Sequence, residues 1–488
     1  MKYLKLKITG EESVMKKKCL LMFTAILVLS LAALSWAEPS IEGKWLGTLE
    51  VSGAKLRIVF NIKQGPDGKL LSTLDSPDQG AKDIPVDETS FEKDHLHLGV
   101  KGINGAYEGD ANSDLSEIKG TWSQNGASLP LDLKRTDKVE EVVRPQDPKP
   151  PYPYDEREVS YENKKAGITF GGTLTLPKTG GPFPAVLLIT GSGPEDRNET
   201  VFGHHPFLVL ADYLTRQGIA VLRVDDRGVG KSTGSAERAT SADFVGDVLS
   251  GVDFLKSQNE INSKQIGLIG HSEGGMIAPM AAVQSPDVAY IVLMGGPGIT
   301  GGQLLLMQSS LILKANGTDS SLIEKDRQIN EMAFAVAVSD ADSSTASQKL
   351  HKILSDAIAE MSSQEQQALG ISPSMVDIMV KQMVSPWLRY FLSYDPKPTL
   401  EKVKCPVLAI DSELDLQVPP KEDLQGINDA LKAGGNKDFT TKEFPGLNHL
   451  FQHAKTGSPM EYSSIDETIS PDVLKYISDW ITAHTTNR

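Results

Sequence analysis

The sequence predicts an α/β protein with a mostly parallel sheet, preceded by a small all-β domain. From residue 155 onward, near-continuous apolar runs such as "PAVLLITGSG", "IGLIGHS" and "CPVLAIDSE" alternate with helical segments. Such runs are typical of strands that are buried on both faces of a parallel sheet. Residues 41–136 instead contain short strand-like segments with frequent Gly and Asn/Asp turns, which is the pattern of a small barrel or sandwich.

The first 37 residues have the features of a secretory signal peptide. Residues 15–18 are a basic stretch, residues 19–34 are apolar, and Ser35 and Ala37 supply small side chains at the cleavage point. The apolar run falls short of the roughly 20 residues that a membrane span needs, which disfavours the alternative of an uncleaved anchor. We therefore expect cleavage near Ala37 and a secreted or periplasmic protein.

The charge balance argues against nucleic acid and anionic membrane as partners. The net charge of the whole chain is −15, and the first 37 residues carry six lysines and two glutamates, so their removal leaves −19. A surface of this sign repels polyanions. Only Cys405 of the two cysteines remains after cleavage, so we expect no intrachain disulfide. The sequence makes no prediction of the oligomeric state.

Residues 38–143 are the predicted N-terminal domain, a lipocalin-like barrel or a sandwich. Residues 43–47, "GKWLG", are similar to the opening of lipocalin-like barrels. His95 and His97 lie two apart on one strand face, but metal sites need three or four ligands, so we interpret both as solvated and expect no metal. Residues 144–154 carry five prolines, which predicts a stiff, extended linker.

Residues 155–488 are the second predicted domain. Between about residues 300 and 392 its alternation is interrupted by a segment rich in Leu, Met, Gln, Ser and Ala, which we predict to be an inserted helical lid. Trp387 and Phe391 are four apart, so on a helix they share one face. We expect this face to form one wall of a substrate pocket; packing within the lid's own core is the alternative.

Residues 266–282, "IGLIGHSEGGMIAPMAA", place the motif GHSEG (residues 270–274) between a buried strand and a helix. Glycines on both sides of Ser272 permit a strained turn in which a Cβ on either neighbour would clash. A strand–turn–helix of this kind lifts a nucleophilic serine out of a sheet. The alternative is an ordinary helix N-terminus that is capped by a serine.

With the surrounding motifs, this region resembles the α/β-hydrolase fold over about residues 155–488. It is similar in particular to bacterial two-domain carboxylesterases of the EstD type, which also carry an N-terminal β-domain. The motifs are "GSGPEDRN", "DDRGVGKSTG", "GHSEGG", "YDPKPTLEKVKCPVLAI" and "FPGLNHLFQ". The resemblance implies a serine hydrolase of short-acyl esters that needs no cofactor.

A serine nucleophile needs a base, and in this fold the chain order is Ser, then Asp or Glu, then His. Only His449, His453 and His484 follow the last strands. The resemblance implies that His449, in "FPGLNHLF", is the base. His453 is the second choice, and His484 lies in the C-terminal tail.

The acid is expected after the strand "PVLAI", where Asp411, Glu413 and Asp415 are the candidates. The family pattern Gly-x-x-Asp implies Asp415. The chain departs from that pattern because Ser412 stands where Gly is usual, which leaves Asp411 and Glu413 open.

Two backbone N–H groups are expected to form an oxyanion hole. One belongs to Glu273, the residue after the nucleophile, and the resemblance assigns the other to Ser192, with Gly193 as the alternative; a simple tight turn is the other interpretation of this loop. The Glu273 side chain is expected at the pocket mouth, solvated or in a salt bridge. "DRGVGKST" is not a phosphate-binding loop, because Asp225 stands where that motif needs its first Gly.

The sequence therefore predicts an exported serine carboxylesterase with the triad Ser272, Asp415 and His449. Its expected partner is a small-molecule ester. A serine peptidase of the aminopeptidase kind on the same fold, and a binding protein with a vestigial hydrolase site, are the two alternatives.

Overall fold

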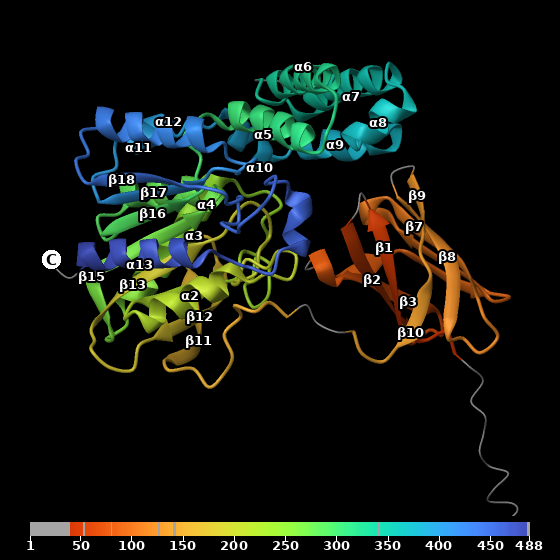
Figure 1. Cartoon of the computed structure of the whole chain (residues 1–488), viewed down its shortest axis with the longest axis horizontal. Coiled ribbons are helices and arrows are strands. Elements are labelled where there is room, and N and C mark those ends of the chain that lie inside the picture. Colours follow the sequence, from red (N-terminus) through yellow and green to blue (C-terminus); the bar gives the residue numbers. More distant parts are fainter. Residues whose placement is uncertain are drawn as a thin grey trace, which may run out of the picture.

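The structure, a computed structural model, describes residues 40–51, 54–79, 81–124, 127–139, 143–339 and 342–485. The predicted signal peptide, residues 1–37, lies outside the described residues. Figure 1 shows an α/β sheet domain, a layer of helices along one edge of it, and an all-β domain beside both. In the described part of the chain, every helix is too short or too polar to cross a bilayer.

The N-terminal domain is one antiparallel sheet that rolls into an incomplete barrel. Its strands follow the order β4-β3-β2-β1-β10-β8-β7-β6-β5, and β9 pairs with β8. The sheet curves until β4 lies against β6, and the interior is filled by Trp45, Phe60 and Tyr107, all fully buried. The strands are β1 (Gly43–Val51), β2 (Ala54–Gln64), β3 (Leu70–Ser76), β4 (Ala81–Val86), β5 (Glu88–Glu92), β6 (His95–Val100), β7 (Gly105–Ala111), β8 (Glu117–Gln124), β9 (Ala127–Pro130) and β10 (Leu133–Thr136).

The second domain has an eight-stranded sheet in the order β11-β12-β14-β13-β15-β16-β17-β18. Strands β13 to β18 run parallel, and β12 is antiparallel to its neighbours β11 and β14. The predicted buried strands of a mostly parallel sheet are therefore confirmed. The strands are β11 (Asp155–Asn163), β12 (Ile168–Leu176), β13 (Phe183–Ile189), β14 (Ala220–Val224), β15 (Ile261–His271), β16 (Tyr290–Met294), β17 (Val407–Ser412) and β18 (Phe439–Phe444).

Helices cover both faces of this sheet, so that alternate strand residues enter two separate cores. In β13, Leu187 and Ile189 join a core with α3 (Ser241–Lys256), α4 (Glu273–Gln284) and α12 (Pro420–Ala433). Val186 and Leu188 join the core on the other face, with α2 (Pro206–Arg216) and α13 (Pro471–Thr485). Burial on both faces explains why these strands are continuous apolar runs in the sequence.

Between β16 and β17, the described residues of the range 301–393 form six α-helices, where the sequence predicts a helical segment over about residues 300–392. They are α5 (Gly301–Ala315), α6 (Ser320–Ala337), α7 (Ser343–Ala359), α8 (Ser363–Leu369), α9 (Val376–Met383) and α10 (Pro386–Ser393). Leu350 and Leu354 of α7 are buried in a core that belongs to the insertion alone. By contrast, Leu304 of α5 and Phe391 of α10 belong to the core of the sheet domain. Helices α5 and α10 therefore attach the insertion to the sheet.

The beginning of the proline-rich segment, which the sequence predicts to be a stiff, extended linker over residues 144–154, is bonded to the second domain. Arg144 is 5% exposed and donates hydrogen bonds to the carbonyl oxygens of Phe202, Ser463 and Ile465 at 2.6–3.1 Å. The side-chain oxygen of Gln146 accepts the Thr468 and Ile469 backbone N–H groups. These residues pack on the hydrolase domain, whose structural boundary therefore lies near residue 143 and not at residue 155.

Candidate active site

Ser272 occupies a strained turn between β15 and α4, with φ 52° and ψ −119°. A Cβ on Gly270 would lie 2.0 Å from the Gly274 carbonyl oxygen, and one on Gly274 would lie 2.2 Å from the Ile189 carbonyl oxygen. Both positions therefore require glycine. The turn has the strand–turn–helix geometry that the sequence predicted, and it places Ser272 at the N-terminus of α4.

His449 and Asp415 form a buried pair. His449 Nδ1 lies 2.6 Å from Asp415 Oδ2, and the two side chains are 4% and 0% exposed. The other carboxylate oxygen, Oδ1, accepts the backbone N–H groups of Gln417 and Val418 at 2.8 Å each. These donors favour the ionised carboxylate, so His449 donates through Nδ1–H, and its Nε2 is left as the basic nitrogen.

The segment after β16 contacts both the serine and this pair. The Met294 carbonyl oxygen accepts the Ser272 backbone N–H at 2.9 Å. A Cβ on the next residue, Gly295, would lie 3.3 Å from the His449 ring and 3.4 Å from Asp415 Oδ2. Among the described residues, the Ser272 hydroxyl has no hydrogen-bond partner. The structure thus brings the three predicted triad residues to one edge of the sheet and leaves the hydroxyl free.

The alternative acids have other partners. Asp411 is 1% exposed and accepts the Ser412 backbone N–H; burial, and then the neighbouring Asp415 charge, raise the pKa of Asp411 well above its usual value. Glu413 accepts the Gly446 N–H at 2.8 Å. Of the three candidates, Asp415 is the one that is paired with His449.

The alternative bases also lie elsewhere. His453 is 65% exposed and bonds to Glu467. His484, at the end of α13, bonds to the Trp480 carbonyl oxygen and to Asp438.

The loop after β13 passes beside the serine. A Cβ on Gly191 would lie 3.4 Å from Ser272 Cβ. The Gly191 N–H is already bonded to Glu199 Oε1 at 2.8 Å. Among the described residues, the backbone N–H groups of Ser192 and Glu273 have no acceptor. They are therefore free to bind an oxyanion, in the places where the sequence predicts the two donors.

The side chain of Glu273 is neither solvated nor in a salt bridge, contrary to the expectation from the sequence. It is 2% exposed and accepts hydrogen bonds from Ser241 Oγ at 2.6 Å and from Trp387 Nε1 at 2.9 Å. Burial raises the pKa of this carboxyl. Sequence reasoning missed the contact because Ser241 and Trp387 are 32 and 114 residues away along the chain.

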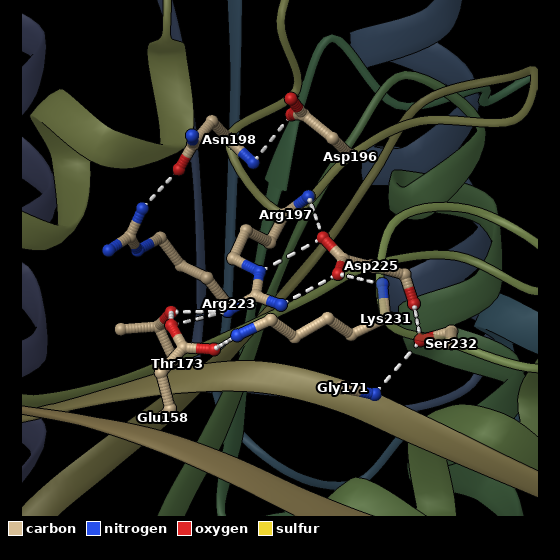
Figure 2. A network of polar contacts seen from close by, with 10 residues as sticks. All are labelled: Glu158, Gly171, Thr173, Asp196, Arg197, Asn198, Arg223, Asp225, Lys231 and Ser232. Carbon is tan, nitrogen blue, oxygen red and sulfur yellow. Dashed lines mark hydrogen bonds and ion pairs between the residues drawn. The ribbon is translucent and has the colours of Figure 1, made fainter.

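Figure 2 shows a polar network that connects the loop after β13 to neighbouring strands of the sheet. Arg197 holds both carboxylate oxygens of Asp225, at 2.9 and 2.7 Å, and its third nitrogen lies 2.9 Å from Glu158. Asp225 also accepts the Lys231 backbone N–H at 2.9 Å. A Cβ on Gly230 would lie 2.4 Å from Asp225. The motif "DRGVGKST" therefore wraps a carboxylate that anchors the loop, and its glycines serve this turn.

A small cavity lies beside the same loop. It measures about 70 Å³. Thr190, Gly191 and Gly193 line it from the loop, and Phe244, Val248 and Ile277 line it from α3 and α4. Strand residues such as Leu187 and Ile189 complete its apolar lining, which includes no residue of the insertion and neither Ser272 nor His449.

The two histidines of the N-terminal domain are not simply solvated. His95 lies 2.7 Å from Asp110 and 2.9 Å from Glu108, and His97 lies 2.5 Å from Glu108, on an exposed face of the sheet. Within the described ranges, no group of three or more His, Cys, Asp or Glu side chains is arranged to hold a metal ion.

The strand order and the strained turn after the central strand β15, with the His449–Asp415 pair on the loops after β18 and β17, are those of the α/β-hydrolase fold. The comparison with known families agrees with this class. The family model Hydrolase_4, described as serine aminopeptidase, S33, matches residues 206–368. The matched span includes Ser272 and ends before Asp415 and His449.

Two relatives are similar in sequence. Esterase EstD of Thermotoga maritima is 32% identical over 135 residues, which are 28% of this chain and 32% of EstD. An uncharacterized 31.7 kDa protein from the traX-finO intergenic region of Escherichia coli is 27% identical over 231 residues, 46% of this chain and 72% of that protein. The alignment with EstD thus spans about a third of that protein's length.

Solved structures of α/β hydrolases and esterases also match. The hydrolase GrgF from a Penicillium species is 17% identical with a TM-score of 0.42, covering 68% of this chain and 99% of GrgF. A Pyrococcus furiosus esterase is 14% identical with a TM-score of 0.40, covering 68% of this chain and 90% of the esterase. Since both scores are below 0.5, the fold assignment rests on the strand order of this chain.

Proposed function

We propose that the protein is an exported serine carboxylesterase that cleaves esters with short acyl groups. The observation that carries this proposal is the buried His449–Asp415 pair, 2.6 Å apart, beside the strained turn of Ser272. The name of EstD supports ester cleavage, since EstD is similar to this chain over 135 residues.

In the proposed reaction, His449 Nε2 takes the hydroxyl proton as Ser272 Oγ attacks the ester carbonyl carbon. Asp415 holds His449 in the tautomer that exposes Nε2 and stabilises the imidazolium that forms. The N–H groups of Ser192 and Glu273 bind the oxyanion of the tetrahedral intermediate. His449 then protonates the leaving alcohol, and an acyl-enzyme on Ser272 remains.

A water molecule completes the cycle. His449 removes a proton from the water as its oxygen attacks the acyl carbon, and the carboxylic acid leaves while Ser272 recovers its proton. Each proton and bond in this sequence is handled by the chain's own residues, so we expect activity to be unchanged by a metal chelator.

The preference for short acyl groups is proposed on the similarity to EstD-type carboxylesterases alone. The cavity beside the loop after β13 is lined by neither Ser272 nor His449, so it does not bear on the acyl group. Export is proposed on the sequence of residues 1–37 alone, and the N-terminal residue of the protein purified from a bacterial culture tests it.

A serine aminopeptidase is the second candidate, because the matching family model carries that description. One panel separates the candidates: p-nitrophenyl acetate, butyrate and octanoate, amino-acid p-nitroanilides, and a fluorophosphonate that labels active serines. We expect fast turnover of acetate and butyrate esters. Turnover of the anilides without turnover of the esters would establish the peptidase. If no substrate were turned over and the fluorophosphonate did not label the protein, the protein would instead be a binding protein with a vestigial hydrolase site.

A further inference from the structure

Glu199 and His271 form a second buried carboxylate–histidine pair, next to the first. Glu199 Oε1 lies 2.9 Å from His271 Nδ1, and the two side chains are 6% and 8% exposed. His271 precedes Ser272 in the chain, and its ring centroid is 4.7 Å from that of His449. The proposed reaction uses neither residue.

This pair contacts two loops that the proposed reaction uses. Glu199 Oε1 also accepts the Gly191 N–H at 2.8 Å, one residue before the oxyanion donor Ser192. On the other side of the ring, His271 Nε2 lies 3.1 Å from the backbone carbonyl oxygen of His449. A continuous series of hydrogen bonds therefore runs from the loop after β13, through the strand that ends at Ser272, to the loop that carries His449.

The partners fix the protons on the ring. A carbonyl oxygen can only accept, so His271 Nε2 carries a hydrogen. Glu199 Oε1 already accepts an N–H, which favours the carboxylate and hence a hydrogen on Nδ1 as well. Burial by itself would lower the pKa of His271, but the Glu199 carboxylate and the His449 carbonyl oxygen outweigh it and raise that pKa to about 9. At neutral pH the ring therefore donates in both directions.

We propose that Glu199 and His271 are positioning residues that fix the oxyanion loop and the His449 loop relative to Ser272. This inference rests on the proposed function, since it assigns a role within the same reaction. A buried ion pair costs desolvation and is weak evidence for stability. Hydrogen bonds to two separate loops instead point to a role in geometry, where a displacement of about 1 Å can cost on the order of 100-fold in rate.

The test compares Glu199→Ala with Glu199→Gln. Glu199 Oε1 makes both bonds, so a glutamine oxygen in its place can still accept the Gly191 N–H and an Nδ1–H of His271, whereas alanine loses both bonds. For p-nitrophenyl butyrate, we expect Glu199→Ala to lower kcat about 10- to 100-fold with KM within about threefold. Glu199→Gln should keep kcat within about fivefold of the wild type, and hydrogen exchange over residues 190–200 should be faster in Glu199→Ala alone.

His271→Gln is the second variant, for use if Glu199→Ala does not fold. It cannot reach both loops at once, so kcat should fall about tenfold with little change in KM. The matched control is His453→Gln, which breaks an exposed His–Glu pair on the same loop and should leave kcat unchanged. Wild-type kcat in Glu199→Ala or in His271→Gln would overturn the inference, as would equal losses in both Glu199 variants.

The outcome for the wild type separates this inference from the proposed function. If the wild-type protein neither cleaves esters nor reacts with the fluorophosphonate, the proposed function is wrong, and the inference that rests on it is wrong as well. If the wild type reacts and the variants behave like it, the esterase assignment stands and only the positioning role is lost.

Discussion

Trp387 of the inserted helices donates its indole N–H to Glu273 Oε1 at 2.9 Å. Glu273 follows Ser272 directly, so a lid residue is hydrogen-bonded to the residue that supplies an oxyanion N–H in the proposed reaction. Trp387 also stacks on Phe391, with ring centroids 5.5 Å apart, and it packs against the core of the sheet domain rather than the core of the insertion. This placement argues against packing within the lid's own core, because the Trp387 side chain lies on the sheet domain beside the residue that follows Ser272.

Trp387→Ala should therefore change substrate preference. We expect the ratio of kcat/KM between octanoate and acetate esters to shift by roughly tenfold, since one large apolar contact is lost near the acyl chain. Trp387→Phe should keep that ratio closer to the wild type, because it removes the hydrogen bond and keeps an aromatic ring. Steady-state kinetics on acetate, butyrate and octanoate esters measure both effects.

The control is Met332→Ala on α6, a lid residue that is 52% exposed. It should leave the three substrates in their wild-type ratio. An equal fall for all three esters in Trp387→Ala would mean that this residue only holds the lid in place.

Ser272→Ala should abolish ester turnover and keep the fold. The hydroxyl is the nucleophile that the turn presents, so we expect kcat to fall on the order of 10⁴-fold or more. Methyl replacement of a hydroxyl that has no hydrogen-bond partner among the described residues should leave the thermal midpoint within a few degrees of the wild type. Fluorophosphonate labelling of the variant at the wild-type rate would contradict the assignment.

Asp415→Asn should cost far more activity than changes at the other two acids. Asparagine favours the wrong tautomer of His449 and cannot stabilise the imidazolium, so kcat should fall by about 10⁴-fold. Asp411→Asn should cost less than tenfold, because Asp411 is not bonded to His449 and an asparagine oxygen can still accept the Ser412 N–H.

Glu413→Gln completes the comparison of the three acids. Glu413 holds the Gly446 N–H, which a glutamine oxygen can also accept, so kcat should stay within about threefold of the wild type. If Glu413→Gln lowered kcat more than the other two substitutions, Glu413 would be the acid of the triad. The presence of Ser412 in place of the usual Gly would then have changed the position of the acid, and the His449–Asp415 pair would not be the catalytic pair.

The sequence could predict the parts of the site that depend on local pattern and chain order. The turn at Ser272 needs glycines at fixed positions, so the five residues of the motif are enough to predict it. Chain order limits the base to three histidines and the acid to three carboxylates, and the family resemblance selects His449 and Asp415 among them. Glu199 and His271 are 72 residues apart, and no spacing rule joins a loop glutamate to the residue before a nucleophile. Their pairing depends on how β13 and β15 lie side by side.

The same limit applies to the fold. Continuous apolar runs identified the buried strands, because burial on both faces leaves a signal in each strand by itself. The docking of residues 144–154 left no such signal. Arg144 binds backbone carbonyl oxygens, including that of Ile465, 321 residues later. Because every residue has a backbone carbonyl, such a contact leaves no signal in the sequence. The proline content therefore predicted a linker but gave no sign that its beginning is anchored to the second domain.

Acid should destabilise the hydrolase domain through His204. This fully buried ring accepts from Thr468 and donates to the Tyr462 carbonyl oxygen. Burial, and then the Arg144 charge, lower its pKa from 6.5 to about 4. The unfolded chain therefore binds the proton first as the pH falls. The stability that depends on neutral His204 is complete above about pH 6.5 and is lost toward pH 4, by up to about 3 kcal/mol.

Thermal unfolding midpoints between pH 8 and pH 4.5 measure this dependence. His204→Gln should be less stable than the wild type at pH 8 but should lose less of its midpoint on acidification. His351→Gln, at an exposed lid position, should follow the wild-type curve. Identical pH dependence in His204→Gln and the wild type would assign the acid loss to the carboxylates instead.

The last prediction concerns where the hydrolase domain begins. A truncated protein that starts at Asp155 lacks Arg144 and Gln146, whose bonds hold the segment 463–469. That segment follows the loop that carries His449 and begins within the last turn of η4 (Pro459–Ser464). Its carbonyl and N–H groups would lose their buried partners, at a cost of about 1–3 kcal/mol for each unsatisfied group.

We therefore expect the protein that starts at Val143 to retain most of its esterase activity and to unfold at a higher temperature than the one that starts at Asp155. The shorter protein should lose kcat before it loses its fold, because the segment it releases adjoins the His449 loop. Arg144→Ala in the full-length chain is the matched variant, since it removes the same three hydrogen bonds and leaves the β-domain in place. Equal midpoints and equal kcat for the two truncated proteins would show that residues 144–154 act as a spacer after all.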